Sequence, residues 1–256
     1  MKRLRKRDYK ISNGVRAISL KFKVALILSV FLFVSVLFMF SPVFHLVDVT
    51  VTGNTQVDQS EIIERAGLGQ PTNFFLFGLD RARRYIMENP YIDQVNFNRS
   101  FPDGLEIVVR ERFLSGYIEY LEGMFLYIDE HGRVLEVRSY MREELPIITG
   151  LRFSHVHVGQ ILEVDNPAAF STVVTYAQLL NRHNLAGVIS RMDVSDPGNT
   201  RLRLYNIEVY LGDTSHAHEK ILTLREIFDV WPVVRDVSGF LDLREPGSEY
   251  IFRILT

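Results

Sequence analysis

The chain has 256 residues, no cysteine and a formal net charge of −2. The lack of cysteine excludes disulfides, thiol nucleophiles and thiolate metal sites. The small net charge conceals an uneven distribution. Residues 1–23 carry nine basic residues and one acid, which leaves 20 basic and 30 acidic residues in 24–256. An acidic segment without a basic stripe argues against nucleic acid as its ligand.

An apolar run without any charge occupies residues 24–44 and reads VALILSVFLFVSVLFMFSPVF. As a helix it would extend about 31 Å, the thickness of the hydrocarbon core of a bilayer. It has no polar face, which disfavours a buried helix of a soluble core. A cleaved signal peptide is the alternative, but the run is long and ends in Phe38, Met39 and Phe40, without small residues at a cleavage site.

The flanks of this run predict its orientation. Basic residues concentrate on the cytoplasmic side of membrane spans, so we expect residues 1–23 to be a cytoplasmic tail. The tail could instead bind nucleic acid, but next to a membrane, attraction to anionic lipid is the simpler explanation. We therefore expect a tail at 1–23, a transmembrane helix at 24–44 and residues 45–256 outside the cytoplasm, in a single-pass type II arrangement. The basic residues are Lys2, Arg3, Arg5, Lys6, Arg7, Lys10, Arg16, Lys21 and Lys23.

Residues 45–114 carry strand and helix patterns in the order β-α-α-β-β. Asp58 followed by Glu61 is typical of a capping box, and Gly67 of a helix C-terminus. Asp103-Gly104 between two alternating apolar runs predicts a hairpin. The order predicts one sheet covered by two helices. The expected elements are strands at His45–Thr52, Ile92–Arg99 and Leu105–Phe113, and helices at 58–67 and 79–89.

Residues 115–256 are richer in strands, and we expect them to form a second unit. Asp165-Asn166-Pro167 should begin a helix, with proline in the first turn. Residues 145–150 read as an irregular link. The expected strands are Gly116–Tyr120, Met124–Asp129, Val134–Arg138, Ile189–Val194, Arg201–Tyr205, Glu208–Leu211, Leu241–Leu243 and Glu249–Ile254, and the expected helices are Ala168–Arg182 and His216–Val230.

No catalytic motif is recognisable in the sequence, and no cofactor or metal is expected. His155 and His157 would share one face of a strand, but a metal would need a third ligand from elsewhere. His216 and His218 fall at a helix start, where residues two apart do not face each other. The acid pairs Asp129-Glu130 and Glu143-Glu144 read as a solvated turn and a solvated loop, because adjacent strand residues point apart.

Several residue strings resemble those of the FtsQ/DivIB family of bacterial cell-division proteins. In the first part they are VTGNTQVDQSEIIERAGL and NPYIDQVNFNRSFPDGLEIVVRERF, and in the second YIDEHGRVLEV, LPIITGL, VYLGD and LDLRE. The resemblance implies an α+β fold: a transmembrane helix, a POTRA domain at 45–114, and a mixed β-domain at 115–256 with an exposed C-terminal edge strand. Where some members have an aromatic residue after the Asp-Leu-Arg string, this chain has Glu245.

The last strand is the candidate partner-binding site. The chain stops at Thr256, soon after that strand, so we expect an uncovered sheet edge with unpaired N–H and C=O groups. Such an edge can accept a strand of another protein. The resemblance implies that this partner is an FtsB/DivIC-like protein, itself paired with an FtsL-like protein, within the machinery for septal wall synthesis. The candidate residues are Arg244, Glu245, Glu249, Tyr250, Ile251, Phe252 and Arg253.

The resemblance therefore predicts a non-enzymatic scaffold in the bacterial cell membrane at the division septum. One alternative is a POTRA module that guides polypeptides in secretion or membrane assembly, but such proteins continue into a β-barrel. The other alternative is an anchored wall hydrolase or wall-binding module, which should show paired acids or metal ligands that converge in a groove.

Overall fold

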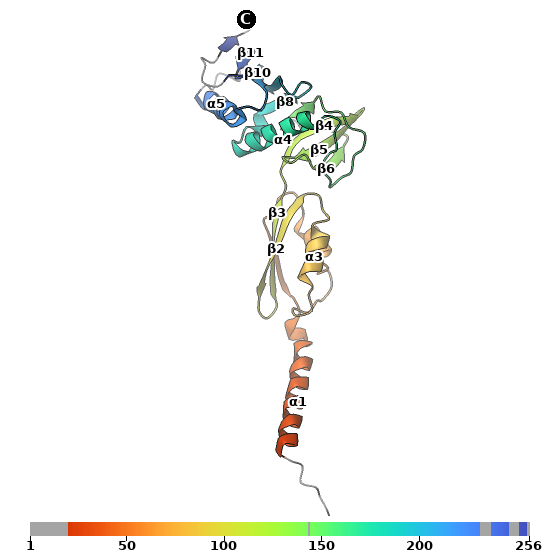
Figure 1. The fold of residues 1–256 in the computed structure, drawn as a ribbon. Coiled ribbons are helices and arrows are strands. Elements are labelled where there is room, and N and C mark those ends of the chain that lie inside the picture. Colours follow the sequence, from red (N-terminus) through yellow and green to blue (C-terminus); the bar gives the residue numbers. More distant parts are fainter. Residues whose placement is uncertain (1–19, 143, 231–236, 246–250, 255–256) are drawn as a thin grey trace, which may run out of the picture.

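The computed structural model describes residues 20–142, 144–230, 237–245 and 251–254 (Figure 1). A helix, a small domain and a larger domain follow one another along the chain and in space. The helix is α1 (Leu20–Met39), in which no residue is buried. Its length and apolar composition suit a membrane crossing, and it is the one helix of that kind in the described part of the chain.

The bounds of α1 differ from the predicted span at 24–44. The helix starts earlier and includes Lys21 and Lys23, and it ends at Met39. The side chain of Ser41 accepts a hydrogen bond from the N–H of Val43 and caps a short 3₁₀ helix, η1 (Pro42–Phe44). Phe44 is buried. The last residues of the apolar run therefore form the junction between α1 and the first domain.

The first domain has the predicted order β-α-α-β-β. Its three-stranded sheet has the order β1-β3-β2, with β1 parallel and β2 antiparallel to the central strand β3. Buried Ile62, Ala82 and Ile86 from the two helices belong to the same core as buried residues of β2 and β3. The elements are β1 (Asp48–Thr52), α2 (Gln59–Arg65), α3 (Leu79–Ile86), β2 (Ile92–Ser100) and β3 (Gly104–Glu111).

The predicted capping box at α2 is wrong, although the helix starts where expected. Asp58 has the extended backbone of an N-cap, but its side chain makes no capping hydrogen bond. The carboxylate of Glu61 instead accepts hydrogen bonds from Arg65 and from Asn89, 28 residues away. Gly67 has a φ of +77°, which confirms its predicted role after the helix C-terminus.

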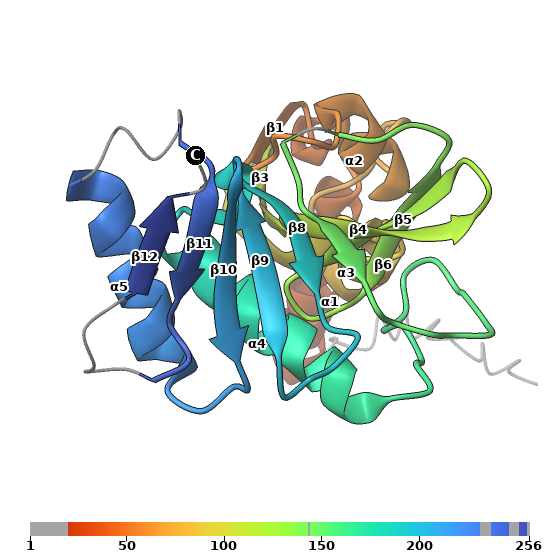
Figure 2. The same ribbon diagram turned by 90° about the horizontal axis from the view of Figure 1, so that it is seen from above.

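The second domain is built on a nine-stranded mixed sheet with the order β12-β11-β10-β9-β8-β7-β4-β5-β6. Helices α4 (Pro167–Arg182) and α5 (Ala217–Val230) lie on one side of strands β8 to β12 (Figure 2). Asn166 caps α4 by accepting hydrogen bonds from the N–H groups of Ala168 and Ala169, as expected of a helix with proline in its first turn. The strands are β4 (Leu114–Leu121), β5 (Met124–Asp129), β6 (Val134–Arg138), β7 (Ile147–Thr149), β8 (Ile189–Asp193), β9 (Thr200–Leu204), β10 (Ile207–Gly212), β11 (Gly239–Asp242) and β12 (Ile251–Ile254).

Two expectations for this domain are corrected. Residues 145–150 are not wholly irregular, because they contain β7, which runs parallel to both β4 and β8 and joins two halves of the sheet. Asp129 is not part of a solvated turn. It is 2% exposed, accepts hydrogen bonds from the N–H groups of His131 and Arg133, and lies 3.3 Å from Arg112.

Each domain has its own hydrophobic core. The buried apolar residues around β1-β3-β2 fall between Val57 and Val109, and the main core of the second domain falls between Ile118 and Leu243. A smaller cluster of Tyr117, Phe125 and Tyr127 adjoins it on β4 and β5. Separate cores agree with the predicted division near residue 114, which remains a prediction about independent folding.

Candidate partner-binding edge strand

Strand β12 is the end strand of the nine-stranded sheet as the described residues form it. It pairs antiparallel with β11, and the partner residues are Gly239 with Ile254, Phe240 with Arg253, Leu241 with Phe252, and Asp242 with Ile251. Figure 2 shows β12 outside β11 at this side of the sheet. The predicted edge strand is therefore present among the described residues at Ile251–Ile254.

The directions of the N–H and C=O groups in β11 determine which backbone groups of β12 point away from the sheet. On the side of β10, Gly239 donates its N–H to the O atom of Asn206, the residue before β10, at 3.4 Å, and Leu243 donates its N–H to Tyr210 O at 2.9 Å. Backbone groups of successive strand residues point to opposite neighbours. Those of Phe240 and Asp242 therefore point to β12.

This alternation continues on β12. Phe240 and Asp242 face Arg253 and Ile251, which use their backbone groups within the sheet. The N–H and C=O groups of Phe252 and Ile254 consequently point away from β11. A strand that added to β12 would bond to these two residues.

The opposite edge of the sheet is partly covered. At the start of β6, Val134 donates its N–H to Gln160 O at 2.9 Å and accepts from the N–H of Gly159 at 2.7 Å. A loop of the same domain thus occupies bonding positions that an added strand would need. This difference favours β12 over β6 as a docking edge.

Arg244 and Glu245 follow β11 and are exposed. The guanidinium of Arg244 bonds both carboxylate oxygens of Asp242, at 2.9 Å from Nε to Oδ1 and 2.5 Å from Nη2 to Oδ2. These bonds from Arg244 hold the pKa of the Asp242 carboxyl below its ordinary value. The guanidinium carbon also lies 5.9 Å from the ring centre of Tyr210.

The other predicted site residues lie on or before β12. Arg253 is exposed, and its guanidinium carbon is 5.7 Å from the ring centre of Phe240. Ile251 and Phe252 are placed by the backbone of β12. Glu249 and Tyr250 lie outside the described residues.

A row of arginines and aromatic rings lies beside the edge strand and was not predicted from the sequence. The rings of Tyr210 on β10 and Phe240 on β11 meet edge to face at 6.0 Å, and Arg201 on β9 covers Tyr210 at 5.2 Å. These residues alternate with Leu202, Val209 and Leu241, which are buried in the core. The row therefore lies on the sheet face opposite the core. The alternation of buried and exposed positions in β9 to β11 could have identified it.

The histidine pairs do not form a shared site. His155 and His157 lie in a loop rather than in the expected strand. His218 is in α5, with its ring 5.4 Å from that of His183, while His216 precedes the helix and contacts Glu219. In the described part of the chain, no three His, Asp or Glu side chains are grouped as metal ligands would be.

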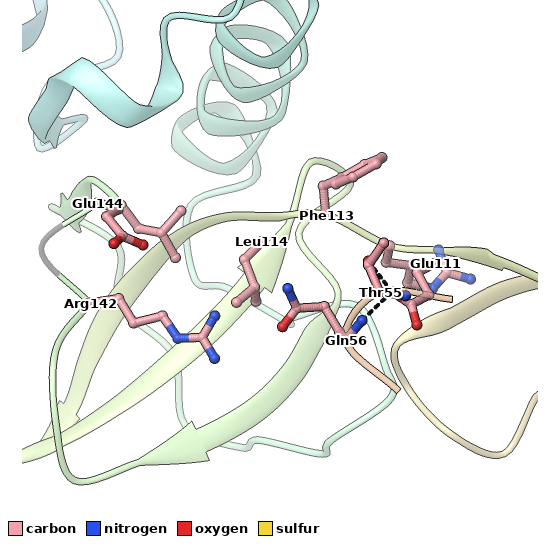
Figure 3. A pocket seen from close by; sticks show the side chains of 9 residues that line it. Thr55, Gln56, Glu111, Phe113, Leu114, Arg142 and Glu144 are labelled. Atoms are coloured by element: carbon pink, nitrogen blue, oxygen red, sulfur yellow. Dashed lines mark hydrogen bonds between the residues drawn. The ribbon is translucent and has the colours of Figure 1, made fainter. Parts of the chain in front are cut away.

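A pocket of about 220 Å³ lies where the two domains meet (Figure 3). Its polar centre on the side of the first domain is the Glu111 carboxylate, which binds the backbone of the loop before α2. Arg142 and Glu144 contribute from the second domain, with Leu114 between the two sides. Because Glu111 is fully engaged with its own domain, this pocket is better understood as part of the junction than as a site of reaction.

The sequence comparisons agree with this architecture. Residues 44–112 match the FtsQ-type POTRA domain family. A cell division protein DivIB of Clostridium tetani is 24% identical over 213 residues, which is 82% of this chain and 80% of the relative. A cell division protein FtsQ of Syntrophotalea carbinolica is 27% identical over 210 residues, 79% of this chain and 70% of the relative.

These matches cover both domains, and the two names belong to the family that the residue strings resemble. The first domain has the strand and helix order expected of a POTRA domain, and the second ends in the expected edge strand. The first domain matches the FtsQ-type POTRA family, and over both domains the chain is similar to proteins named cell division protein DivIB and cell division protein FtsQ.

Proposed function

We propose that this chain is a non-enzymatic scaffold of the bacterial divisome that binds its partners by strand addition at β12. The partners are an FtsB/DivIC-like protein and, through it, an FtsL-like protein, and their binding helps to control septal peptidoglycan synthesis. The observation that carries the proposal is the outward direction of the Phe252 and Ile254 backbone groups at the end of the sheet.

Strand addition divides affinity and specificity between backbone and side chains. The outward N–H and C=O groups of β12 supply the hydrogen bonds, whatever the sequence of the partner. Side chains of the added strand on one face would lie next to Arg253, Phe240 and Arg244. Aromatic rings and arginine are the side chains that most often dominate binding energy at interfaces.

The proposed topology places residues 1–19 and the start of α1 on the cytoplasmic side and both domains outside. The nine basic residues of the tail support it, because they would be retained on the inner side of the membrane. A reporter that is active only outside the cytoplasm should be active when fused to Thr256. Activity of a cytoplasmic reporter at the same position would contradict this orientation.

Proline substitution tests the docking edge directly, since proline has no N–H to donate. Phe252→Pro or Ile254→Pro should leave β11 and β12 paired but remove one outward donor, and affinity for the extracytoplasmic fragment of the FtsB/DivIC-like partner should fall about tenfold or more. Phe252→Val and Ile254→Val retain the N–H and are the matched controls. Arg253→Pro should instead disturb the fold, because its N–H faces β11.

Calorimetry with the purified partner fragment gives the affinities, and circular dichroism reports the fold. If Phe252→Pro and Ile254→Pro both bind like the valine controls, the docking edge lies elsewhere. The alternative is a polypeptide-guiding role of the POTRA domain, for which β1 offers an edge strand.

A further inference from the structure

An aromatic cluster lies where α1 meets the first domain. Phe44 contacts Phe38 of α1 at 5.2 Å between ring centres, Phe75 at 5.1 Å and Phe101 at 5.7 Å. Phe74 contacts Phe75 and Phe101 at 5.4 and 6.0 Å. Figure 1 shows that the β2–β3 turn, which contains Phe101, and the segment before α3 both lie at the α1 end of the domain. We call these five phenylalanines the basal cluster.

The outer side of this region is apolar and exposed. Phe101 belongs to the basal cluster but is still 70% exposed. Three further residues are at least 60% exposed: Val43 and Val47 at the start of the domain, and Leu76 before α3. Single exposed apolar residues are ordinary, but a group of this kind around one end of a domain marks an interaction surface.

This surface is attached closely to α1. The side chain of Asn73 donates a hydrogen bond to the C=O of Met39, the last residue of the helix, at 2.8 Å. The N–H of Phe74 donates to Phe44 O at 2.7 Å, and His45 pairs with Asn73. No charged residue separates the helix from the cluster, because residues 40–44 are Phe, Ser, Pro, Val and Phe.

The charge-free part of α1 is short for a bilayer. It runs from Val24 to Met39, which is 16 residues and about 24 Å as a helix, against about 30 Å for a typical hydrocarbon core. Lys21 and Lys23 can extend toward the inner headgroups. On the outer side, the remaining apolar depth must come from residues beyond Met39, and these are Phe40, Val43 and the exposed residues around the basal cluster.

We propose that the base of the first domain, formed by Val43, Val47, Phe75, Leu76 and Phe101, is seated in the outer interface of the lipid bilayer. The inference rests on the proposed anchoring by α1 and adds a second membrane contact to it. The domain is then held at a fixed height and tilt over the membrane. Arg99, which stacks on Phe74 at 5.1 Å and donates to Phe77 O, lies beside this base and can meet lipid phosphate.

Tryptophan quenching tests the proposal on the full chain. Trp231 is first changed to phenylalanine, so that one introduced tryptophan reports alone. The probes are Phe101→Trp and Leu76→Trp, each in vesicles of phosphatidylcholine and phosphatidylglycerol with or without brominated acyl chains. Phe31→Trp in α1 is the positive control, and Leu121→Trp on the β4–β5 hairpin, 58% exposed, is the matched negative control.

We expect both base probes to lose about half of their fluorescence in brominated vesicles, as a ring at the headgroup boundary should, while the hairpin probe stays unchanged. If the α1 probe is quenched and neither base probe is, the proposed contact of the base with the membrane is wrong, while the proposed membrane span by α1 still holds. No quenching of any probe overturns both.

The surface could instead pack against a second copy of the chain. Phe101→Cys tests this, because the chain has no native cysteine. If the base probes are not quenched and Phe101→Cys forms a disulfide-linked dimer on oxidation, the base contacts a second copy of the chain. The proposed membrane contact would then be wrong.

Discussion

Arg112, which follows β3, lies 3.3 Å from Asp129, the last residue of β5, and so forms an ion pair between the two domains. Its other terminal nitrogen lies 2.8 Å from Asp93 of β2. One guanidinium thus bridges a carboxylate of each domain. Tyr91 of the first domain lies near Glu136 of β6, and burial together with this carboxylate raises the pKa of the tyrosine hydroxyl. The relative position of the docking edge and the anchor depends on these contacts.

Arg112→Gln should loosen the junction. Asp129 is 2% exposed, and loss of its charged partner should cost about 1–3 kcal/mol. Arg110→Gln is the matched control, since Arg110 is 61% exposed and pairs with Asp93 alone, a contact worth about 0–1 kcal/mol. Spin-label distances between the domains should broaden in Arg112→Gln and stay narrow in Arg110→Gln. Equal distributions in the two variants would show that Arg112 does not hold the domains.

Glu111 should make the stability of the first domain depend on pH. Burial raises the pKa of its carboxyl, but hydrogen bonds from the Thr55 hydroxyl and from the N–H groups of Thr55, Gln56 and Val57 outweigh burial and lower it. A carboxyl with a depressed pKa in the folded state adds stability above its unfolded pKa of about 4.3. That stability is lost as the pH falls through the folded value.

The experiment is urea unfolding from pH 7 to pH 3 on wild type and on Glu111→Gln. At pH 7 the variant should be less stable by about 1–3 kcal/mol, because an amide cannot accept all four bonds. The difference should shrink as the pH falls and the wild-type carboxyl takes up a proton. If the difference in unfolding free energy between wild type and Glu111→Gln stays constant over this pH range, the ionised carboxylate does not have the proposed role.

Local patterns predicted most elements of both domains, because helix caps, turns and the alternation of apolar and polar residues in strands each depend on a few neighbouring residues. β7 was missed because it is three residues long and follows a proline, and only its neighbours β4 and β8 make it a strand. The burial of Asp129 was missed because its partner Arg112 comes from a different segment, just after the end of β3. The outward direction of the Phe252 N–H and C=O groups follows only from the order of β10, β11 and β12 in the sheet. A local sequence pattern does not contain that order.

Lys220, the one lysine beyond α1, should be a determinant of stability in the second domain. It is 2% exposed, and its ammonium donates hydrogen bonds to Leu211 O at 2.7 Å and to Asp213 O at 2.9 Å. Burial lowers the pKa of this ammonium. Lys220→Met keeps the apolar stem but removes the ammonium that donates to Leu211 O and leaves Asp213 O with the Tyr176 hydroxyl as its side-chain donor. We expect a cost of about 1–3 kcal/mol in unfolding free energy.

The neighbouring substitution Glu219→Gln is the control for Lys220→Met, because that side chain is exposed. Urea denaturation followed by circular dichroism should separate the two variants. Equal midpoints would mean that water replaces the ammonium at no cost, and Lys220 would then lose its assigned role.

Arg244 should contribute less to partner binding than the backbone of β12 does. Its side chain is 55% exposed, and its guanidinium is already bound to Asp242 of the same domain. An added strand would meet it at the rim, where a charge pair is worth about 0–1 kcal/mol, or at most about a fivefold change in affinity. Arg244→Glu should therefore weaken binding less than Phe252→Pro, and Arg203→Glu, on the same face but on β9, should have no effect.

Calorimetry with the partner fragment at two salt concentrations separates the contributions. The deficit of Arg244→Glu should diminish at high salt, because exposed charges are screened, whereas that of Phe252→Pro should persist. If Arg244→Glu costs as much as Phe252→Pro and salt does not restore it, the guanidinium is buried in the complex. Breaking such a buried pair costs about 3–5 kcal/mol, and the docking surface would then be centred on Asp242 and Arg244 rather than on the edge of β12.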